Sequence, residues 1–170
     1  MKFPHIFTLI IILIFCTGFN FTISYKSNVN QIEKQFQLAL NNVENIVYTK
    51  VPRGLIISID ERYFFDCNEV LIKESSLPIL NNISETLKKL PNFCVVENHT
   101  EAKSNVENWE LSVQRASNIA EYLVKYGNLQ SQRIFPLGFG EIMPFYKDVP
   151  NHNNMNNRID FVIIEYEVMR

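Results

Sequence analysis

The pattern of apolar and polar positions sets the first 25 residues apart from the rest of the chain. No charged residue occurs from Ile6 to Ile23, and Lys2 is the only positively charged residue before that run. A transmembrane helix needs about 20 apolar residues, whereas a cleavable signal has an apolar stretch of about 7 to 15 followed by small residues. Both descriptions fit, so we expect residues 1–25 to be either a membrane anchor or a signal peptide.

Cys16 allows a third interpretation, a lipid-modified N-terminus. Phe15 disfavours it, because a small residue is expected just before such a cysteine. All three interpretations make the membrane a partner of the N-terminal segment. They also place the rest of the chain outside the cytoplasm, in the periplasm or on the cell-wall side of a membrane.

Residues 26–52 are polar, with apolar side chains three or four positions apart. These side chains are Ile32, Phe36, Leu40, Val43 and Ile46. Such spacing is typical of a short amphipathic helix. We therefore expect a polar linker, helical over part of its length, between the N-terminal segment and a domain at residues 53–170.

Five apolar or alternating runs in that domain predict β-strands. They are Leu55–Ile59, Tyr63–Phe65, Phe93–Glu97, Ile134–Leu137 and Arg158–Tyr166. The last run places Ile159, Phe161 and Ile163 on one face of its strand. The stretch from Met143 to Asn157 holds two prolines and five asparagines, a composition that predicts a long loop.

Two amphipathic helices are predicted between the strands. The first has Pro78 in its first turn and ends before Pro91, and its apolar face is formed by Leu80, Ile83, Leu87 and Leu90. The second begins at the capping box of residues 104–107 and runs to about Tyr126. We expect its inner face to be Trp109, Val113, Ala116, Ala120 and Leu123, with Trp109 in the core. The order β-α-β-α-β-β predicts an α/β (α+β) sandwich, with two main helices packed on one mixed sheet.

Composition narrows the function classes. Hydrophobic residues make up 46% of the chain and charged residues 20%, as in a globular protein with one core. The formal net charge of -2 leaves no basic surplus for a phosphate backbone, so nucleic acid is not expected as a partner. Cys67 and Cys94 lie at opposite ends of predicted strands. We therefore expect two small buried side chains rather than a disulfide.

Six short motifs occur in a fixed order between Arg53 and Tyr166. They are Arg53–Ile59, Phe65–Asn68, Val96–Glu101, Asn108–Ala116, Gly138–Glu141 followed by Pro144, and Met155–Ile159. The fourth reads Asn-Trp-Glu-Leu-Ser-x-x-Arg-Ala without a departure. The ordered set resembles the OmpA-like peptidoglycan-binding domain, and especially its branch in the MotB-type flagellar stator subunit.

The resemblance implies a non-catalytic protein that binds peptidoglycan and tethers the envelope, or an envelope complex, to the cell wall. The ligand would be the free end of diaminopimelate in a peptide stem, which carries an ammonium and a carboxylate on one carbon. An arginine can hold a carboxylate through two charge-assisted hydrogen bonds. The resemblance assigns the carboxylate to Arg115, the ammonium to Glu101, and neutral hydrogen bonds to Asn68 and Asn108. It adds a contribution from Arg158 and implies no cofactor.

Three departures from the family pattern fall at this pocket. Glu101 stands in place of an aspartate, Asn98 in place of a glycine, and Asn157 in place of the first of two arginines. A degenerate domain that keeps the fold without binding the wall is therefore an alternative, because a fold does not guarantee a function.

A stator subunit is a second alternative. That role needs a proton-carrying acid within the membrane span, and Ile6 to Ile23 contains none. A metal-dependent hydrolase is a weaker third: His99-x-Glu101 resembles part of a zinc signature, but no Pro-Cys-x-x-Cys follows, so no metal is expected. Whether the chain forms a homodimer stays open.

Overall fold

The structure, a computed structural model, describes residues 25–26, 28–101, 105–144, 156–165 and 167–168. These residues fall into two units, of which the smaller contains strands β1 (Tyr25–Lys26) and β7 (Glu167–Val168), paired antiparallel. The expected membrane segment, including Cys16, lies outside the described residues except for Tyr25. In the ranges that are described, no helix is both long and apolar enough to cross a membrane.

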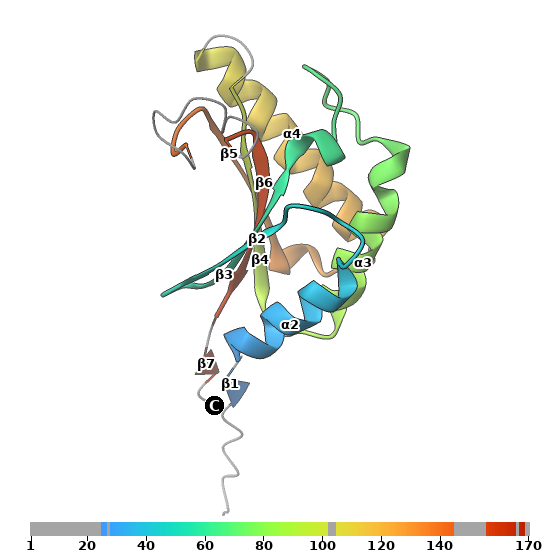
Figure 1. The fold of residues 1–170 in the computed structure, drawn as a ribbon, viewed down its shortest axis with the longest axis vertical. Coiled ribbons are helices and arrows are strands. Elements are labelled where there is room, and N and C mark those ends of the chain that lie inside the picture. Colours follow the sequence, from blue (N-terminus) through green and yellow to red (C-terminus); the bar gives the residue numbers. More distant parts are fainter. Residues whose placement is uncertain (1–24, 27, 102–104, 145–155, 166, 169–170) are drawn as a thin grey trace, which may run out of the picture. The chain divides into compact units, whose positions relative to one another are not determined.

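The larger unit, residues 27–166, is built on one five-stranded sheet (Figure 1). Its strands are β2 (Val47–Val51), β3 (Gly54–Asp60), β4 (Phe93–His99), β5 (Ile134–Gly140) and β6 (Arg158–Ile164). Their order in the sheet is β2-β3-β6-β4-β5. Only β4 and β5 run parallel, and the other neighbours are antiparallel. The mixed sheet that the sequence predicts is confirmed, with β2 as an additional edge strand.

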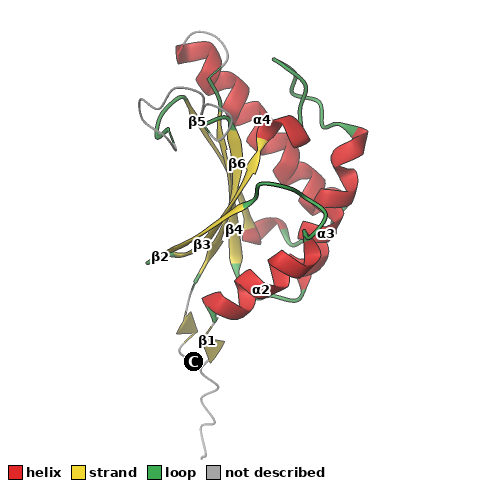
Figure 2. Ribbon diagram, viewed as in Figure 1, coloured by secondary structure: helices red, strands yellow, loops and turns green. Residues whose placement is uncertain are grey.

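Three helices cover one face of this sheet (Figure 2). They are α2 (Val29–Ala39), α3 (Leu77–Lys88) and α4 (Asn105–Lys125). Short 3-10 turns occur at η1 (Glu61–Tyr63), η2 (Glu74–Ser76) and η3 (Ser131–Arg133). The apolar face of α3 is buried as expected, and Ile159, Phe161 and Ile163 of β6 are buried in the same core.

The segment expected to be a linker supplies both α2 and β2. Asn28 caps α2 by accepting a hydrogen bond from the backbone N–H of Asn30. Ile32, Phe36 and Leu40 are buried in the same core as the residues of the sheet. Residues 29–51 therefore belong to the folded domain and contribute to its stability.

One expected strand is wrong. Tyr63–Phe65 does not pair with the sheet, because the chain leaves β3 at Asp60 and turns. The Asp60 carboxylate accepts from the backbone N–H of Arg62, and the carbonyl of Glu61 accepts from those of Phe64 and Phe65. The two phenylalanines are buried from this turn, so their apolar character reflects core packing rather than a strand.

Trp109 is also misplaced by the sequence prediction: its side chain is 53% exposed. The buried stripe of α4 begins with three polar residues, Asn108, Ser112 and Arg115, and continues through Ile119 and Leu123. Trp109 lies next to that stripe on the helix surface. Ala116, Ala120 and Leu123 are buried as expected, so the predicted inward face differs from the structure only in the first half of α4, at Trp109 and the half-buried Val113.

Both cysteines in the described residues are free. Cys94 is buried as expected, and burial raises the pKa of its thiol to about 12, so the thiol stays protonated. Cys67 is exposed, which contradicts the expectation that both would be buried.

Candidate functional site

Arg115 lies at the centre of the candidate site. Its side chain is 1% exposed, although arginine is seldom buried without partners. Nε donates to the carbonyl of Glu69 at 2.7 Å, and Nη2 donates to the carbonyl of Asp66 at 3.0 Å. The guanidinium also lies 4.9 Å from the centre of the Phe65 ring. The turn of residues 66–69 therefore closes around one edge of the guanidinium.

The other edge of the guanidinium contacts Glu61 and Thr100. Nη1 of Arg115 donates to Glu61 Oε2 at 2.8 Å and to Thr100 Oγ1 at 3.3 Å. Glu61 is itself buried, and Thr100 donates to its second carboxylate oxygen at 3.2 Å. The buried positive charge is thus matched by a buried carboxylate that the family motifs do not single out. An acid directly after an apolar strand is its only sequence signal.

Asn98, one of the three departures from the family pattern, belongs to the same network. Its amide nitrogen lies 3.4 Å from Glu61 Oε2 and donates to the carbonyl of Arg158 at 3.1 Å. A glycine at this position would supply neither contact. The substitution therefore adds a donor near the Glu61 carboxylate.

Two exposed polar residues belong to the segments that contact Arg115. Asn68 lies in the turn whose carbonyls bind Arg115, with a left-handed φ of 59° that asparagine tolerates better than most residues. Glu101 directly follows Thr100, and its backbone N–H donates to Asn157 Oδ1 at 2.8 Å. Two departures from the family pattern, Glu101 and Asn157, are thus in direct contact.

Asn108 lies on α4 two turns before Arg115 and on the same buried stripe, as the seven-residue spacing predicts. Its amide donates to Glu141 Oε2 at 3.1 Å. Glu141 and Glu101 line one small cavity with Thr100 and Gly140. Asn108 is therefore connected to Glu101 through the turn that follows β5.

The Arg158 side chain leaves β6 on the face opposite the helices. Ile159 of β6 is buried in the core beneath the helices, so its neighbours in sequence, Arg158 and Asp160, point to the opposite face. There Arg158 Nε donates to Asp160 Oδ2 at 2.9 Å, and both side chains are buried. Arg158 Nη2 also donates to the carbonyl of Met143 at 3.3 Å, and Met143 lines the same small cavity as Glu101.

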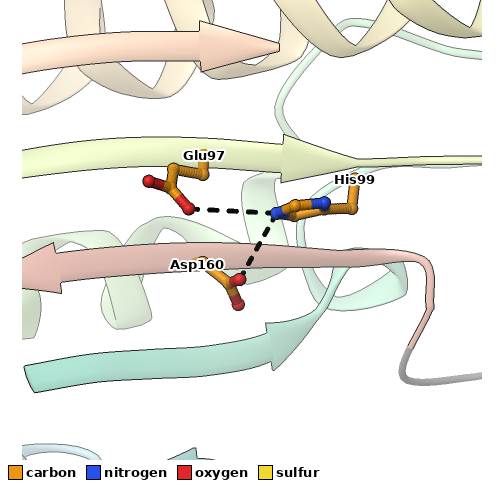
Figure 3. Close-up of side chains that lie close together, drawn as sticks. All are labelled: Glu97, His99 and Asp160. Carbon is orange, nitrogen blue, oxygen red and sulfur yellow. Dashed lines mark ion pairs between the residues drawn. The ribbon is translucent and has the colours of Figure 1, made fainter. Parts of the chain in front are cut away.

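A second buried polar cluster lies on that opposite face. Figure 3 shows the Glu97 and Asp160 carboxylates pointing at the His99 ring, from β4 and β6. His99 Nε2 is 3.4 Å from Asp160 Oδ2 and 3.9 Å from Glu97 Oε2. The three groups offer ligand-type atoms within 4.8 Å of one another, which makes the cluster a candidate for holding either a proton or a cation.

Two pKa shifts accompany this arrangement. Burial lowers the pKa of His99, but the facing carboxylates of Asp160 and Glu97 raise it by more, so the net shift is upward. Burial raises the pKa of Asp160, but His99 and Arg158 lower it by more, so the net shift is downward. The two directions agree with a protonated imidazole beside an ionised carboxylate.

Comparison with known proteins identifies a family and relatives. Residues 64–158 match the OmpA family. The chain is 30% identical over 117 residues to the uncharacterized protein YtxE of Bacillus subtilis, a match that covers 65% of this chain and 48% of that protein. It is 29% identical over 147 residues to motility protein B of the same organism, covering 82% and 54%. The chain thus matches about half the length of these two relatives.

Solved structures share the fold. A MotB-like protein from Desulfovibrio vulgaris superposes with a TM-score of 0.69 at 18% identity, covering 81% of this chain and 91% of that one. The cell wall anchor of the type VI secretion system from Pseudomonas aeruginosa superposes with a TM-score of 0.66 at 17% identity, covering 78% and 96%. At these identities the likeness concerns the fold alone.

Proposed function

Because this chain belongs to the OmpA family, we propose that it is a non-catalytic tether that binds peptidoglycan and holds an envelope component to the cell wall. Support comes from the family match, from the likeness to motility protein B and from the fold shared with a cell wall anchor. The observation that carries the proposal is the site around Arg115. The buried guanidinium there contacts the turn that carries the exposed Asn68 and the threonine that precedes the exposed Glu101.

The proposed ligand is the diaminopimelate end of a stem peptide. Glu101 would pair with its ammonium, because Glu101 is an exposed acid that directly follows Thr100 of the Arg115 network. Arg115 would bind the carboxylate on the same carbon, and Asn68 and Asn108 would add neutral hydrogen bonds. An acid and an arginine are the partners that the two charged groups of an amino-acid end require.

The hydrogen bonds that Arg115 makes within the protein limit how strongly it can bind the ligand carboxylate. Arg115 makes four hydrogen bonds within the protein, one of them to the Glu61 carboxylate. A ligand carboxylate must then use the remaining N–H or displace one of these acceptors. We therefore expect the ammonium contact with Glu101 to contribute more to affinity than the carboxylate contact with Arg115.

Co-sedimentation of the full chain, in mild detergent, with purified peptidoglycan tests the proposal. The wild-type chain should pellet with the wall, and Glu101→Gln should pellet far less. Glu110→Gln is the matched control, because Glu110 is an exposed acid on α4 outside the site. Absence of wild-type binding would leave the degenerate structural domain as the better description, and equal loss in both variants would show nonspecific charge attraction.

The N-terminal segment completes the proposal as a membrane anchor or a cleaved signal. An anchor predicts that the mature protein fractionates with membranes and keeps Met1 or Lys2. A cleaved signal predicts an N-terminus near Phe19. N-terminal sequencing of the protein from its native cells distinguishes the two.

A stator subunit is the second candidate, and the match to motility protein B is the observation that favours it. It would require ion transport across the membrane. Motility restored by this chain alone, in a strain lacking its stator, would favour that function over a simple tether.

A further inference from the structure

The two ring nitrogens of His99 both face hydrogen-bond acceptors. Nδ1 lies 3.1 Å from the carbonyl oxygen of Ile142, in the turn after β5. Nε2 faces the carboxylates of Asp160 and Glu97. A neutral imidazole has one N–H and one lone pair, so either tautomer would set a lone pair against an acceptor. Only the doubly protonated ring donates on both sides.

Both carboxylates have arginine partners. Arg158 Nε donates to Asp160 at 2.9 Å, and Arg53 Nη2 donates to Glu97 at 3.2 Å. Arg53 is 53% exposed, so water as well as Glu97 solvates its charge. Asp60 lies opposite Arg158 in the sheet and accepts hydrogen bonds from two nitrogens of Arg62. The charges of Asp60 and Arg62 therefore cancel each other.

The net charge of the buried groups around His99 favours a proton over a metal ion in this cluster. Glu97, Asp160 and Arg158 are nearly inaccessible and sum to one negative charge. A protonated His99 brings that sum to zero. A divalent cation beside a neutral ring would leave one uncompensated positive charge in the same buried space, which is costly. A proton fits the cluster better than a dication.

The His99 ring also connects the sheet to the turn that borders the proposed binding site. It stacks on Phe139 with ring centres 4.9 Å apart and planes 3° from parallel. Its Nδ1 lies 3.1 Å from the carbonyl oxygen of Ile142. The backbone N–H of Thr100, the residue after His99, donates to the carbonyl of Gly140 at 2.9 Å. Glu101 follows directly. Residues 139–142 are thus held against the segment that carries Glu101.

We infer that His99 is a positioning residue held as an imidazolium, which fastens the turn of residues 139–142 to the sheet and so orders the Glu101 side of the binding site. The effect on wall binding rests on the proposed function, whereas the charge state of the ring does not. Loss of the ring proton would break one of the two contacts and loosen the turn.

The pH dependence follows from the direction of the shift. The pKa of His99 is raised in the folded protein, through Asp160 and Glu97 and against the effect of burial. Its stabilising contribution is therefore complete below the ordinary histidine pKa of about 6.5 and is lost as pH rises through the higher folded value. Stability and wall binding should both decline on the alkaline side.

Nitrogen NMR of the full chain in detergent, with labelled histidine, tests the charge state directly. We expect both His99 ring nitrogens to be protonated at pH 7, with a midpoint above that of a histidine peptide. Asp160→Asn and Glu97→Gln should each lower the midpoint, and Glu121→Gln should not, because Glu121 is an exposed acid on α4 that does not face the ring. His99→Gln assigns the signal. A singly protonated ring at pH 7, or a stoichiometric shift of its signals by added Zn²⁺, would overturn the inference.

Wall binding provides the second readout. Wild-type co-sedimentation should fall between pH 6 and pH 9, and that of His99→Gln should be weaker and independent of pH over this range. Equal pH dependence in wild type and His99→Gln would contradict the positioning role. A doubly protonated ring in a chain that binds no peptidoglycan at any pH would refute the proposed function and leave the charge assignment intact.

Discussion

Glu61 Oε2 lies 2.8 Å from Arg115 Nη1, and both side chains are almost completely buried. A buried ion pair adds little net stability compared with apolar residues, but the loss of one partner leaves the other charge without compensation. The pair therefore couples the end of β3 to α4, and through Thr100 to the segment that carries Glu101. Changes at Glu61 should reach the candidate site even though Glu61 is not exposed to a ligand.

Glu61→Gln is expected to reduce the free energy of unfolding by about 3 to 5 kcal/mol, because it leaves the Arg115 charge buried without a counter-ion. Urea denaturation of the full chain measures the loss. Arg115→Gln in the Glu61→Gln background should cost far less than Arg115→Gln alone, which gives a double-mutant cycle. Additive losses would mean that the two groups do not depend on each other.

Arg115→Lys should destabilise the fold by about 1 to 3 kcal/mol, although it keeps the positive charge. Lysine lacks the planar fork that reaches Glu61 on one edge and the carbonyls of Asp66 and Glu69 on the other. Affinity for a stem-peptide fragment should fall by about ten- to a hundred-fold in calorimetry. Gln114→Lys is the control on the exposed side of α4. Unchanged affinity would remove Arg115 from the binding site.

Much of the fold follows from the sequence because its apolar periodicity is strong. The positions of α3, α4, β4 and β6 were predictable from regular spacing, capping and proline signals. β2 was not, since Val47–Val51 is an edge strand with mixed polar and apolar residues. A tight turn at Pro52–Arg53 joins it to β3, with Val51 paired to Gly54.

The candidate site was only partly predictable. The motif from Asn108 to Ala116 identifies Arg115, but no sequence pattern reveals that its charge is matched by Glu61, which is 54 residues away in the chain. Arg158 was grouped with the site because the motifs specify the order of residues along the chain but not the face of the sheet on which each side chain lies. Alternation along β6 directs its side chain away from the Ile159 face, and its guanidinium donates to the carbonyl of Met143 in the loop that borders Glu101.

Trp109→Ala should change the free energy of unfolding by less than about 1 kcal/mol, because more than half of the indole is already exposed. Ile119→Ala, at a fully buried position of the same helix, should cost about 2 to 5 kcal/mol and serves as the positive control. A loss of peptidoglycan binding in Trp109→Ala with unchanged stability would mean that the indole touches the ligand. A large loss of stability would contradict its exposed placement.

Gly138→Ala tests whether close packing of α4 on β5 positions the site. A Cβ at residue 138 would lie 2.4 Å from the backbone nitrogen of Val113 and 2.6 Å from Ser112 Oγ, both too short for contact. Ser112 Oγ also accepts from the backbone N–H of Gly140, so it cannot move without breaking that bond. The helix must shift away from the strand.

That shift would carry Asn108 and Arg115 with α4, since both belong to the buried stripe that includes Ser112. We expect a loss of about 1 to 3 kcal/mol in urea denaturation, as for other overpacked sites, together with weaker sedimentation on peptidoglycan. Leu137→Ala, an exposed neighbour in β5, should leave both measurements nearly unchanged. If Gly138→Ala keeps full binding after losing stability, the distance between α4 and β5 does not control the site; if it loses neither, the close approach is not tight in solution.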